Sequence, residues 1–481
     1  MHRLLMGTTL LVAAACGGGG SAAVAPVAVT PSLTIAVPRV VATAATLPAT
    51  AVVVPSGAVT WSSDAPGVAT IAADGQITGV APGSTTIRAT SGSLTQTATV
   101  SVIERFADFS LGAFSGCALT AAKVLYCWGA NYSGEIGFTQ VPDSCVGTAE
   151  CSLFPRVAPP TLTFVQISAR LRTRCGLTAG GDAYCWGSNL ELHLGPSGTC
   201  GSPPTGCTKT AIPALGGLQF TSVSAGAEFA CALTSAGAAY CWGINWSNNI
   251  GATTSGTCGA YSCTLTPLAV SGGLVLHGLS VGARHVCALT ATGAAYCWGA
   301  NPNGEVGNAA TSALGVATPA AVSGGLQFTA ISAGTTHTCA LTAAGQAWCW
   351  GSNNFGKLGD GTVNTSAVPV AVTGGLAFTS IAEGDDHTCA LTAAGLAYCW
   401  GYNGGASLAG GYLGDGTNTE RHAPTAVARG IAFAQLGVSR NRSCGRTAGG
   451  AMYCWGPNIF GQLGVGDSRV ESLTPAGIGV P

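Results

Sequence analysis

The chain has 481 residues, of which only 8% are charged, and its formal net charge is −1. A phosphate-binding surface needs an excess of Lys and Arg, so this balance argues against nucleic acid as a partner. The 72 glycines and the scarcity of Lys and Glu favour strands and tight turns over exposed helices. Twenty-one cysteines are too many for a protein kept reduced in the cytosol, so the composition predicts an exported protein.

Residues 1–15 have the features of an export signal. Arg3 supplies a positive charge, and the apolar stretch Leu4–Ala15 is too short to span a bilayer as a mature helix. The small residues before Cys16 resemble the bacterial lipoprotein signal, in which the cysteine receives the lipids. Ala13 departs from that pattern, which usually has Leu, Val or Ile there. Ordinary secretion is the alternative, and residues 16–26, rich in Gly, Ser and Ala, predict a flexible tether.

Residues 27–103 contain short apolar runs separated by Pro, Gly, Ser and Asp, and no cysteine. Such alternation is typical of an all-β sandwich. Segments 59–64, 68–71 and 75–80, followed by Gly83 and 87–90, resemble the bacterial immunoglobulin-like domain of group 2. The resemblance implies a spacer or, less often, a ligand-binding module.

Trp-Gly recurs seven times within residues 104–481, at intervals of 50 to 58 residues. A cysteine precedes each Trp directly, and a second cysteine lies ten residues earlier. The pairs are Cys117/Cys127, Cys175/Cys185, Cys231/Cys241, Cys287/Cys297, Cys339/Cys349, Cys389/Cys399 and Cys444/Cys454. A repeat of this period indicates a repeat architecture such as a propeller.

Each pair is predicted to form a disulfide across a β-hairpin. Between Cys339 and Cys349, a three-residue loop ends at Gly345, where a positive φ favours glycine. Six repeats carry glycine at this position, whereas the first carries Lys123. With this loop the cysteines lie directly opposite in a non-hydrogen-bonded pair, where side chains approach most closely. Unpaired cysteines and metal binding are the alternatives, but the close ligand pairs of a metal site are missing.

Each repeat contains four short strand candidates, as a propeller blade does. In one copy they are 368–372, 377–382, 387–391 and 397–400. On this grouping the first repeat lacks its leading strand, and 475–480 looks like an additional copy of that strand. We therefore expect 475–480 to complete the first blade and close the ring.

The repeat is seen most fully at 381–384, 387–392 and 356–359. Over about 104–481 it resembles the regulator of chromosome condensation repeat family, which implies a seven-bladed β-propeller. The chain departs from the family in its cysteine pairs, in the glycine spacing of 403–414, and at Arg170 and Ser439, where glycine is usual. The family includes exchange factors for a small GTPase, a β-lactamase inhibitor and binding modules, so the resemblance implies no single activity.

Enzyme motifs are missing from the sequence: it has no HExxH, no nucleophile elbow and no phosphate-binding glycine loop. Its acidic residues do not pair at a repeated position, as glycoside hydrolysis would require. His285, His337 and His387 share one repeat position, where we expect them to fix a turn by hydrogen bonding. The sequence predicts no cofactor and no metal site.

Loops that differ among the repeats indicate a binding face. Three connections are lengthened and carry the close cysteine pairs Cys145/Cys151, Cys200/Cys207 and Cys258/Cys263. Such clipped loops lose less entropy on meeting a partner. Aromatic anchors and basic turns lie on the same predicted face, alongside the acidic Glu228, Glu383, Asp385 and Asp386. The candidate residues are Tyr132, Phe138, Phe154, Arg170, Arg172, Arg174, Trp246, Tyr261, Arg440 and Arg442.

The sequence thus predicts an all-β protein, with an immunoglobulin-like domain (27–103) before a seven-bladed propeller (104–481). We expect an exported lipoprotein at the outer membrane or cell surface, or otherwise a periplasmic or secreted protein. Its expected function is non-catalytic recognition of a protein or glycan partner, with membrane attachment through the lipid alone. The alternatives are an extracellular enzyme acting on glycan or peptide at the propeller channel, a purely structural envelope component and, less favoured, nucleotide exchange.

Overall fold

A computed structural model describes residues 30–38, 40–43, 46–81, 83–138, 143–145, 150–158, 162–189, 207–404, 410–466 and 471–478. The predicted signal, Cys16 and the tether lie outside these residues. The described residues form β-strands and three short 3₁₀ helices, η2 (Trp246–Asn248), η3 (Asn354–Gly356) and η4 (Ala428–Gly430). The all-β class is therefore confirmed.

The N-terminal part folds into three small sheets around one apolar core. Its strands are β1 (Ser32–Ala36), β2 (Val40–Ala42), β3 (Thr46–Pro48), β4 (Thr50–Val54), β5 (Thr60–Ser63), β6 (Ala69–Ile71), β7 (Gln76–Gly79), β8 (Gly83–Ser91) and β9 (Leu94–Ile103). They pair in the orders β1-β4, β2-β9-β8-β5 and β3-β7-β6. Ile77, Ile87 and Val100 are fully buried between the sheets, because alternate residues of a strand face one side.

The rest of the described chain forms seven antiparallel sheets, numbered here as blades 1 to 7. Blade 1 contains β10 (Phe106–Leu111), β11 (Ser115–Thr120), β12 (Leu125–Ala130), β13 (Asp143–Ser144) and β14 (Glu150–Val157). Blade 2 contains β15 (Phe164–Arg170), β16 (Thr173–Thr178), β17 (Ala183–Ser188) and β18 (Cys207–Pro213). Blade 3 contains β19 (Ser222–Ala225), β20 (Phe229–Leu233), β21 (Ala239–Ile244), β22 (Gly256–Cys258) and β23 (Tyr261–Ala269).

The remaining blades have four strands each. Blade 4 contains β24 (Leu276–Val281), β25 (His285–Thr290), β26 (Ala295–Asn301) and β27 (Ser312–Ala321), and blade 5 contains β28 (Ala330–Ala333), β29 (His337–Leu341), β30 (Ala347–Gly351) and β31 (Ser366–Ala371). Blade 6 contains β32 (Phe378–Glu383), β33 (His387–Thr392), β34 (Ala397–Gly401) and β35 (Arg421–Ala426), and blade 7 contains β36 (Gln435–Val438), β37 (Ser443–Arg446), β38 (Met452–Pro457) and β39 (Glu471–Gly477).

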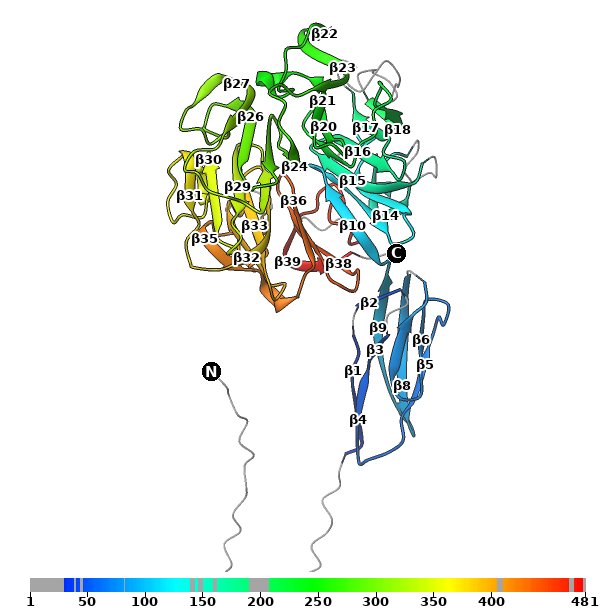
Figure 1. The fold of residues 1–481 in the computed structure, drawn as a ribbon. Coiled ribbons are helices and arrows are strands. Elements are labelled where there is room, and N and C mark those ends of the chain that lie inside the picture. Colours follow the sequence, from blue (N-terminus) through cyan, green and yellow to red (C-terminus); the bar gives the residue numbers. More distant parts are fainter. Residues whose placement is uncertain are drawn as a thin grey trace, which may run out of the picture.

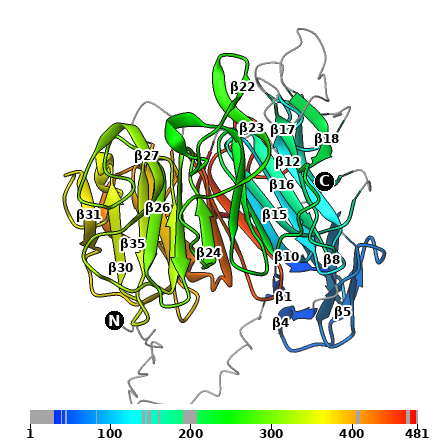
Figure 2. The same ribbon diagram turned by 45° about the horizontal axis from the view of Figure 1, so that its top comes forward.

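The blades are arranged in a ring (Figures 1 and 2). The first strand of each blade contacts the first strand of the next, in the order β10, β15, β19, β24, β28, β32 and β36, and β36 contacts β10. The seam between blades 7 and 1 uses the same backbone bond as each junction from blade 2 to blade 7. Phe106 N donates to Gly450 O at 3.0 Å, as Phe328 N donates to Gly293 O at 2.8 Å between blades 4 and 5.

The expectation for the C-terminal strand is wrong. β39 pairs with β38 of its own blade, and blade 1 has its own outer strand, β14. The error lies in the grouping of strands, because the segment treated as a leading strand is the outer strand of the preceding blade. Val370, for example, pairs with Cys349 rather than with the strand that follows it.

The cysteine hairpins have the predicted register. Thr342 N donates to Gln346 O, and Cys339 lies opposite Cys349 with their Cα atoms 4.1 Å apart. Gly345 has a φ of 76°, and Lys123 adopts the same conformation with a φ of 64°.

Disulfides join all seven hairpin pairs. Two of the loop pairs, Cys145–Cys151 and Cys258–Cys263, are also bonded. The tenth predicted pair includes Cys200, which lies outside the described residues. The hairpin bridges are Cys117–Cys127, Cys175–Cys185, Cys231–Cys241, Cys287–Cys297, Cys339–Cys349, Cys389–Cys399 and Cys444–Cys454. Each of these fourteen cysteines is at most 2% exposed, so the bridges belong to the apolar core of the ring and not to its surface.

The second cysteine of each hairpin marks an irregularity that the repeat pattern did not predict. The third strand of each blade does not pair regularly with the fourth. Its register shifts between this cysteine and the glycine two residues later. Cys349 pairs with Val370, but Gly351 pairs with Ser366, so the outer strand has extra residues there. Such a bulge bends the strand that contains it. The same shift follows Cys127, Cys185, Cys241, Cys297, Cys399 and Cys454.

The repeated tryptophans join neighbouring blades. Trp350, fully buried, donates its indole N–H to Glu305 O of the preceding blade at 2.8 Å. A buried indole N–H needs such a partner, so each bond fixes one blade against the next. The equivalent bond to the preceding blade is made by Trp128, Trp186, Trp298, Trp400 and Trp455.

Candidate binding face

Two kinds of loop share one face of the ring. They are the turn between the first and second strands of each blade and the connection between its third and fourth strands, because antiparallel strands reverse direction at every turn. We call this the decorated face. The hairpin β22–β23 belongs to it and projects from the ring (Figures 1 and 2). Cys258–Cys263 ties this hairpin together.

Trp246 lies at the centre of one aromatic cluster on this face, formed by blades 3 and 4. The ring of Tyr261 lies 4.2 Å from it, and the Arg284 guanidinium lies 4.7 Å from its centroid. The Trp246 indole N–H also donates to Glu228 Oε2 at 2.7 Å. We call Glu228, Trp246, Tyr261 and Arg284 the Trp246 cluster. The disulfide positions it, because Tyr261 lies inside the clipped hairpin.

A second cluster combines blades 7, 1 and 2. Phe460 packs edge-on against both Phe114 and Tyr132, at 5.2 and 5.7 Å between ring centroids. Arg440 lies 5.4 Å from the Phe114 centroid, and Arg172 lies 5.8 Å from that of Tyr132. We call these five residues the Tyr132 cluster. Both arginines are exposed, so their charges are available to a ligand while the aromatic rings hold them in place.

Arg170 reaches from blade 2 to blades 5 and 6 on the other side of the ring. It ends β15 in blade 2, yet its guanidinium donates to Glu383 O at 3.4 Å in blade 6 and to Thr335 Oγ1 at 3.3 Å in blade 5. Thr335 in turn donates to Asp385, whose other oxygen lies 3.7 Å from Arg440 Nε. Arg170 occupies the position where glycine is usual, and its long side chain is what connects opposite sides of the ring.

The carboxyl group of Glu383 is buried beside this arginine, with only 2% of the residue exposed. Burial raises the pKa of Glu383 to about 8, against the opposing effects of Ser332 and Arg170. Equivalent positions in the other blades carry apolar residues such as Val281 and Ala333. Glu383 is thus a titratable group on an otherwise apolar part of the inner wall.

Two predicted members of the face are not on it. Arg174 is 1% exposed and Arg442 is fully buried, so neither guanidinium can contact a partner. Arg174 donates to Ser115 O and Thr173 O, and Arg442 donates to Gly112 O. Burial lowers the pKa of Arg174 to about 10 and that of Arg442 to about 9. They satisfy backbone carbonyls at the junctions between blades 7, 1 and 2.

Two predicted aromatic anchors are only half-exposed. Phe138 packs against the apolar cluster that contains Ile136 and Trp186, and Phe154 packs on Gly466 of blade 7. Conversely, the sequence interpretation missed Arg284, Phe114 and Phe460. Arg284 could have been found by alignment of the repeats, because it occupies the same turn position as Arg172, two residues after the usual glycine.

The three histidines are fully buried, but they do not fix turns as expected. His285, His337 and His387 bond through Nε2 to Thr338, Thr388 and Ser443 of the next blade, each at 2.9 Å. Burial lowers the pKa of His285 and His387 to about 3. The turn itself is closed by backbone, for example Gly334 N to His337 O. These side chains therefore join blades.

Two kinds of feature are missing from the described residues. No group of three His, Cys, Asp or Glu side chains in them is placed to hold a metal ion. Their helices include none with the length and apolarity needed to cross a membrane.

Comparison with protein-family models shows to which family the chain belongs. The family model described as RCC1-like domain matches residues 125–479. The chain belongs to this RCC1-like family. The model described as bacterial Ig-like domain (group 2) matches residues 23–102, ahead of the RCC1-like part. Together with the cysteine pairs, this domain indicates an extracellular protein.

RCC1-like relatives have different activities. The ultraviolet-B receptor UVR8 of Arabidopsis thaliana is 29% identical over 333 residues, which cover 67% of this chain and 71% of the receptor. The E3 ubiquitin-protein ligase HERC2 of Mus musculus is 27% identical over 243 residues, 48% of this chain but only 4% of the ligase. The shared RCC1-like domain is therefore compatible with several functions.

Two solved structures share the fold. Human WBSCR16 has a TM-score of 0.63 at 18% identity, covering 74% of this chain and 94% of that one. Yeast RCC1 (Prp20), solved bound to Kap60, has a TM-score of 0.62 at 20% identity, covering 74% of this chain and 83% of that one. These RCC1-like structures establish the propeller architecture.

Proposed function

We propose that this protein is a non-catalytic binding or scaffold protein that recognises a protein or glycan through its decorated face. The observation that carries the proposal is the Trp246 cluster. The Trp246 side chain contacts Arg284 of blade 4 and Tyr261, which lies on a hairpin closed by a disulfide. Trp, Tyr and Arg are the residues most enriched where binding energy concentrates.

The Tyr132 cluster supports the same face from another part of the ring. It presents Arg172 and Arg440 over the rings of Tyr132 and Phe114, both from blade 1. Because these contacts already exist in the free protein, little side-chain entropy remains to be lost on binding. Both clusters carry cationic edges, so the expected ligand surface has acidic or hydrogen-bond-accepting groups.

The proposal includes display at a bacterial surface. Cys16 would carry the lipid, the tether would lead from it, and the immunoglobulin-like domain would act as the spacer before the propeller. Only Glu104 and Arg105 separate β9 from β10, which leaves a short link between the two parts. Replacing Cys16 with Ala should move the protein from the detergent phase to the aqueous phase in Triton X-114 partitioning, whereas ordinary secretion predicts no change.

A capture experiment tests the binding proposal. The mature protein is immobilised, exposed to envelope extract and to a glycan array, and its bound partner is identified. Trp246→Ala with Tyr261→Ala should weaken partner binding at least tenfold, because it removes two anchors. Arg172→Ala with Tyr132→Ala tests the other cluster in the same assay.

Val275→Ala provides the matched control, because Val275 is exposed on the linker between blades 3 and 4, on the opposite face. Its partner affinity should equal that of the unmodified protein. Unchanged binding by both cluster variants would show that the decorated face is not the site. Turnover of any captured glycan or peptide would contradict the non-catalytic assignment.

A further inference from the structure

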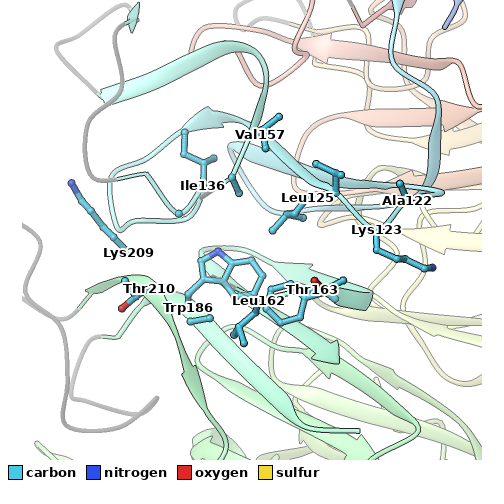
Figure 3. A pocket seen from close by; sticks show the side chains of 15 residues that line it. Ala122, Lys123, Leu125, Ile136, Val157, Leu162, Thr163, Trp186, Lys209 and Thr210 are labelled. Carbon is cyan, nitrogen blue, oxygen red and sulfur yellow. The ribbon is translucent and has the colours of Figure 1, made fainter. Parts of the chain in front are cut away.

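An apolar cavity lies between blades 1 and 2, separate from the two aromatic clusters. Its volume is about 270 Å³. Figure 3 shows Leu125, Ile136 and Val157 on its blade 1 side, with Leu162 and Trp186 on its blade 2 side. The Trp186 indole N–H already donates to Glu135 O, so this side chain offers the cavity only carbon surface. Small-molecule sites have this composition, mostly apolar with a few polar groups at the edge.

Two equivalent junctions have smaller cavities. Between blades 6 and 7 the cavity volume is about 70 Å³, and Val427 covers the inside of the linker. The next residue, Ala428, donates its N–H to Gly414 O at 2.9 Å. The cavity between blades 3 and 4 has a volume of about 200 Å³. The cysteine hairpin of blade 3 and the linker to blade 4 line it, and Trp298 does not. The same linker position is occupied by Val270, Val322 and Val372, and the residues after them donate to Gly251, Gly307 and Gly359.

The first linker departs from this pattern at two consecutive positions. Ala158 takes the place of valine, which removes two methyl groups beside the cavity. Residue 159 is proline in the sequence, a residue with no N–H to donate at this linker position. Ala214 replaces valine in the second linker, but Leu215 there retains an N–H. The first linker therefore combines a smaller side chain with a residue that has no backbone N–H.

A third departure places a cation at the edge of the same cavity. Lys123 lines it and has a φ of 64°, where the other six repeats carry glycine. A side chain in this conformation costs backbone free energy, and such strain is concentrated at functional positions. Lys209 lies at the other end in Figure 3, but it is already paired with Glu150 at 3.2 Å. Lys123 is therefore the cation available to a ligand.

We propose that this cavity binds a single-chain fatty carboxylate, with its alkyl chain against Trp186 and its carboxylate at Lys123. Cavity size fits this ligand class, because a dry apolar cavity of about 150 Å³ already holds benzene. The lysine stem is flexible enough to bring its ammonium over the entrance. The departures from the repeat serve one purpose in this arrangement: Ala158 leaves space in the cavity, and Lys123 supplies the counter-charge.

Calorimetric titration of the mature protein with decanoate tests the proposal. The expected result is saturable binding with one site per chain. Ala158→Val should weaken the affinity about tenfold by restoring the side chain that fills the other linkers. Lys123→Gly should weaken it about fivefold through loss of the ion pair, while raising the melting temperature because the strain is relieved. A lower affinity together with a higher melting temperature would show that this variant is folded and has lost binding alone.

Ala214→Val is the matched control, since it makes the same change at the next linker and should leave the affinity unchanged. Decanol should bind about fivefold more weakly than decanoate, and decyltrimethylammonium more weakly still. Equal binding of decanoate and decanol would overturn the role of Lys123. Absence of saturable binding, or equal affinities of the Ala158→Val variant and the unmodified protein, would overturn the site itself.

Discussion

The Nε2 atom of His337 lies 2.9 Å from the hydroxyl oxygen of Thr388, which belongs to the next blade. That hydroxyl donates its proton to Lys357 O at 2.9 Å, so it must accept from the histidine. His337 therefore carries its proton on Nε2, and its buried Nδ1 has no hydrogen-bond partner among the described residues. The pairs His285–Thr338 and His387–Ser443 repeat the arrangement.

Replacing His337 with Ala should destabilise the propeller by about 3 kcal/mol. The substitution leaves a cavity and removes the Nε2–H that donates to the Thr388 hydroxyl. Urea unfolding followed by far-UV circular dichroism measures the change. His277→Ala serves as the control, since His277 is exposed and its loss should cost little. Equal effects of both substitutions would show that the interblade bond adds nothing.

The histidine bonds should make the protein sensitive to acid. Burial holds the pKa of His387 at about 3, whereas the unfolded chain takes up a proton near its ordinary value of 6.5. The unfolded state thus binds more protons between these values, and stability falls as the pH drops below about 6.5. The stability difference between the unmodified protein and His387→Gln should stay constant from pH 7.5 to about 6.5 and then shrink towards pH 5, by on the order of 1 kcal/mol per pH unit.

Glu383 should show the opposite pH dependence. Its folded pKa of about 8 exceeds its ordinary value of 4.5, so the folded state binds more protons between them. Its contribution is present below pH 4.5 and is lost as the pH rises through 8. Glu383→Gln keeps a neutral side chain, so this variant should gain stability relative to the unmodified protein between pH 5 and pH 8. A constant difference across that range would contradict the burial argument.

The hairpin disulfides should contribute separately in each blade. Replacing Cys339 and Cys349 together with Ala should lower the free energy of unfolding by roughly 2–3 kcal/mol, as expected for a loop of about ten residues. Thiol titration in denaturant without reductant should detect no free thiol in the mature chain, apart from Cys16 if it carries no lipid. Two or more free thiols would disprove the predicted framework of ten bridges.

Local geometry was predictable from the sequence, whereas long-range placement was not. The register from Cys339 to Cys349 followed from a three-residue loop ending in glycine, since that loop fixes every pair beyond it. The blade containing 475–480 could not be fixed in this way, because a repeat of four strands can be divided at more than one point. Strand pairings such as that of Cys454 with Ala476 resolve the division.

The candidate face was predicted in part for a similar reason. Arg172 and Arg174 differ by two positions, but the first lies in a turn and is exposed, while the second lies in β16 and is buried. A shift of two residues in an expected turn is therefore enough to misplace an arginine. Arg170 was predicted on the face. Its contact with Glu383, however, joins residues 213 positions apart in the sequence, and no local pattern predicts a contact between them.

Blade 7 is completed by its own outer strand, so no sheet in the described ring is shared between the start and the end of the propeller. The seam at Phe106 and Gly450 has the same backbone bond as an internal junction. As a place to cut the chain, the seam is therefore equivalent to the junctions that share this bond. A circular permutant opened at the linker between blades 4 and 5, with blade 7 joined to blade 1, would keep all seven sheets and their disulfides intact.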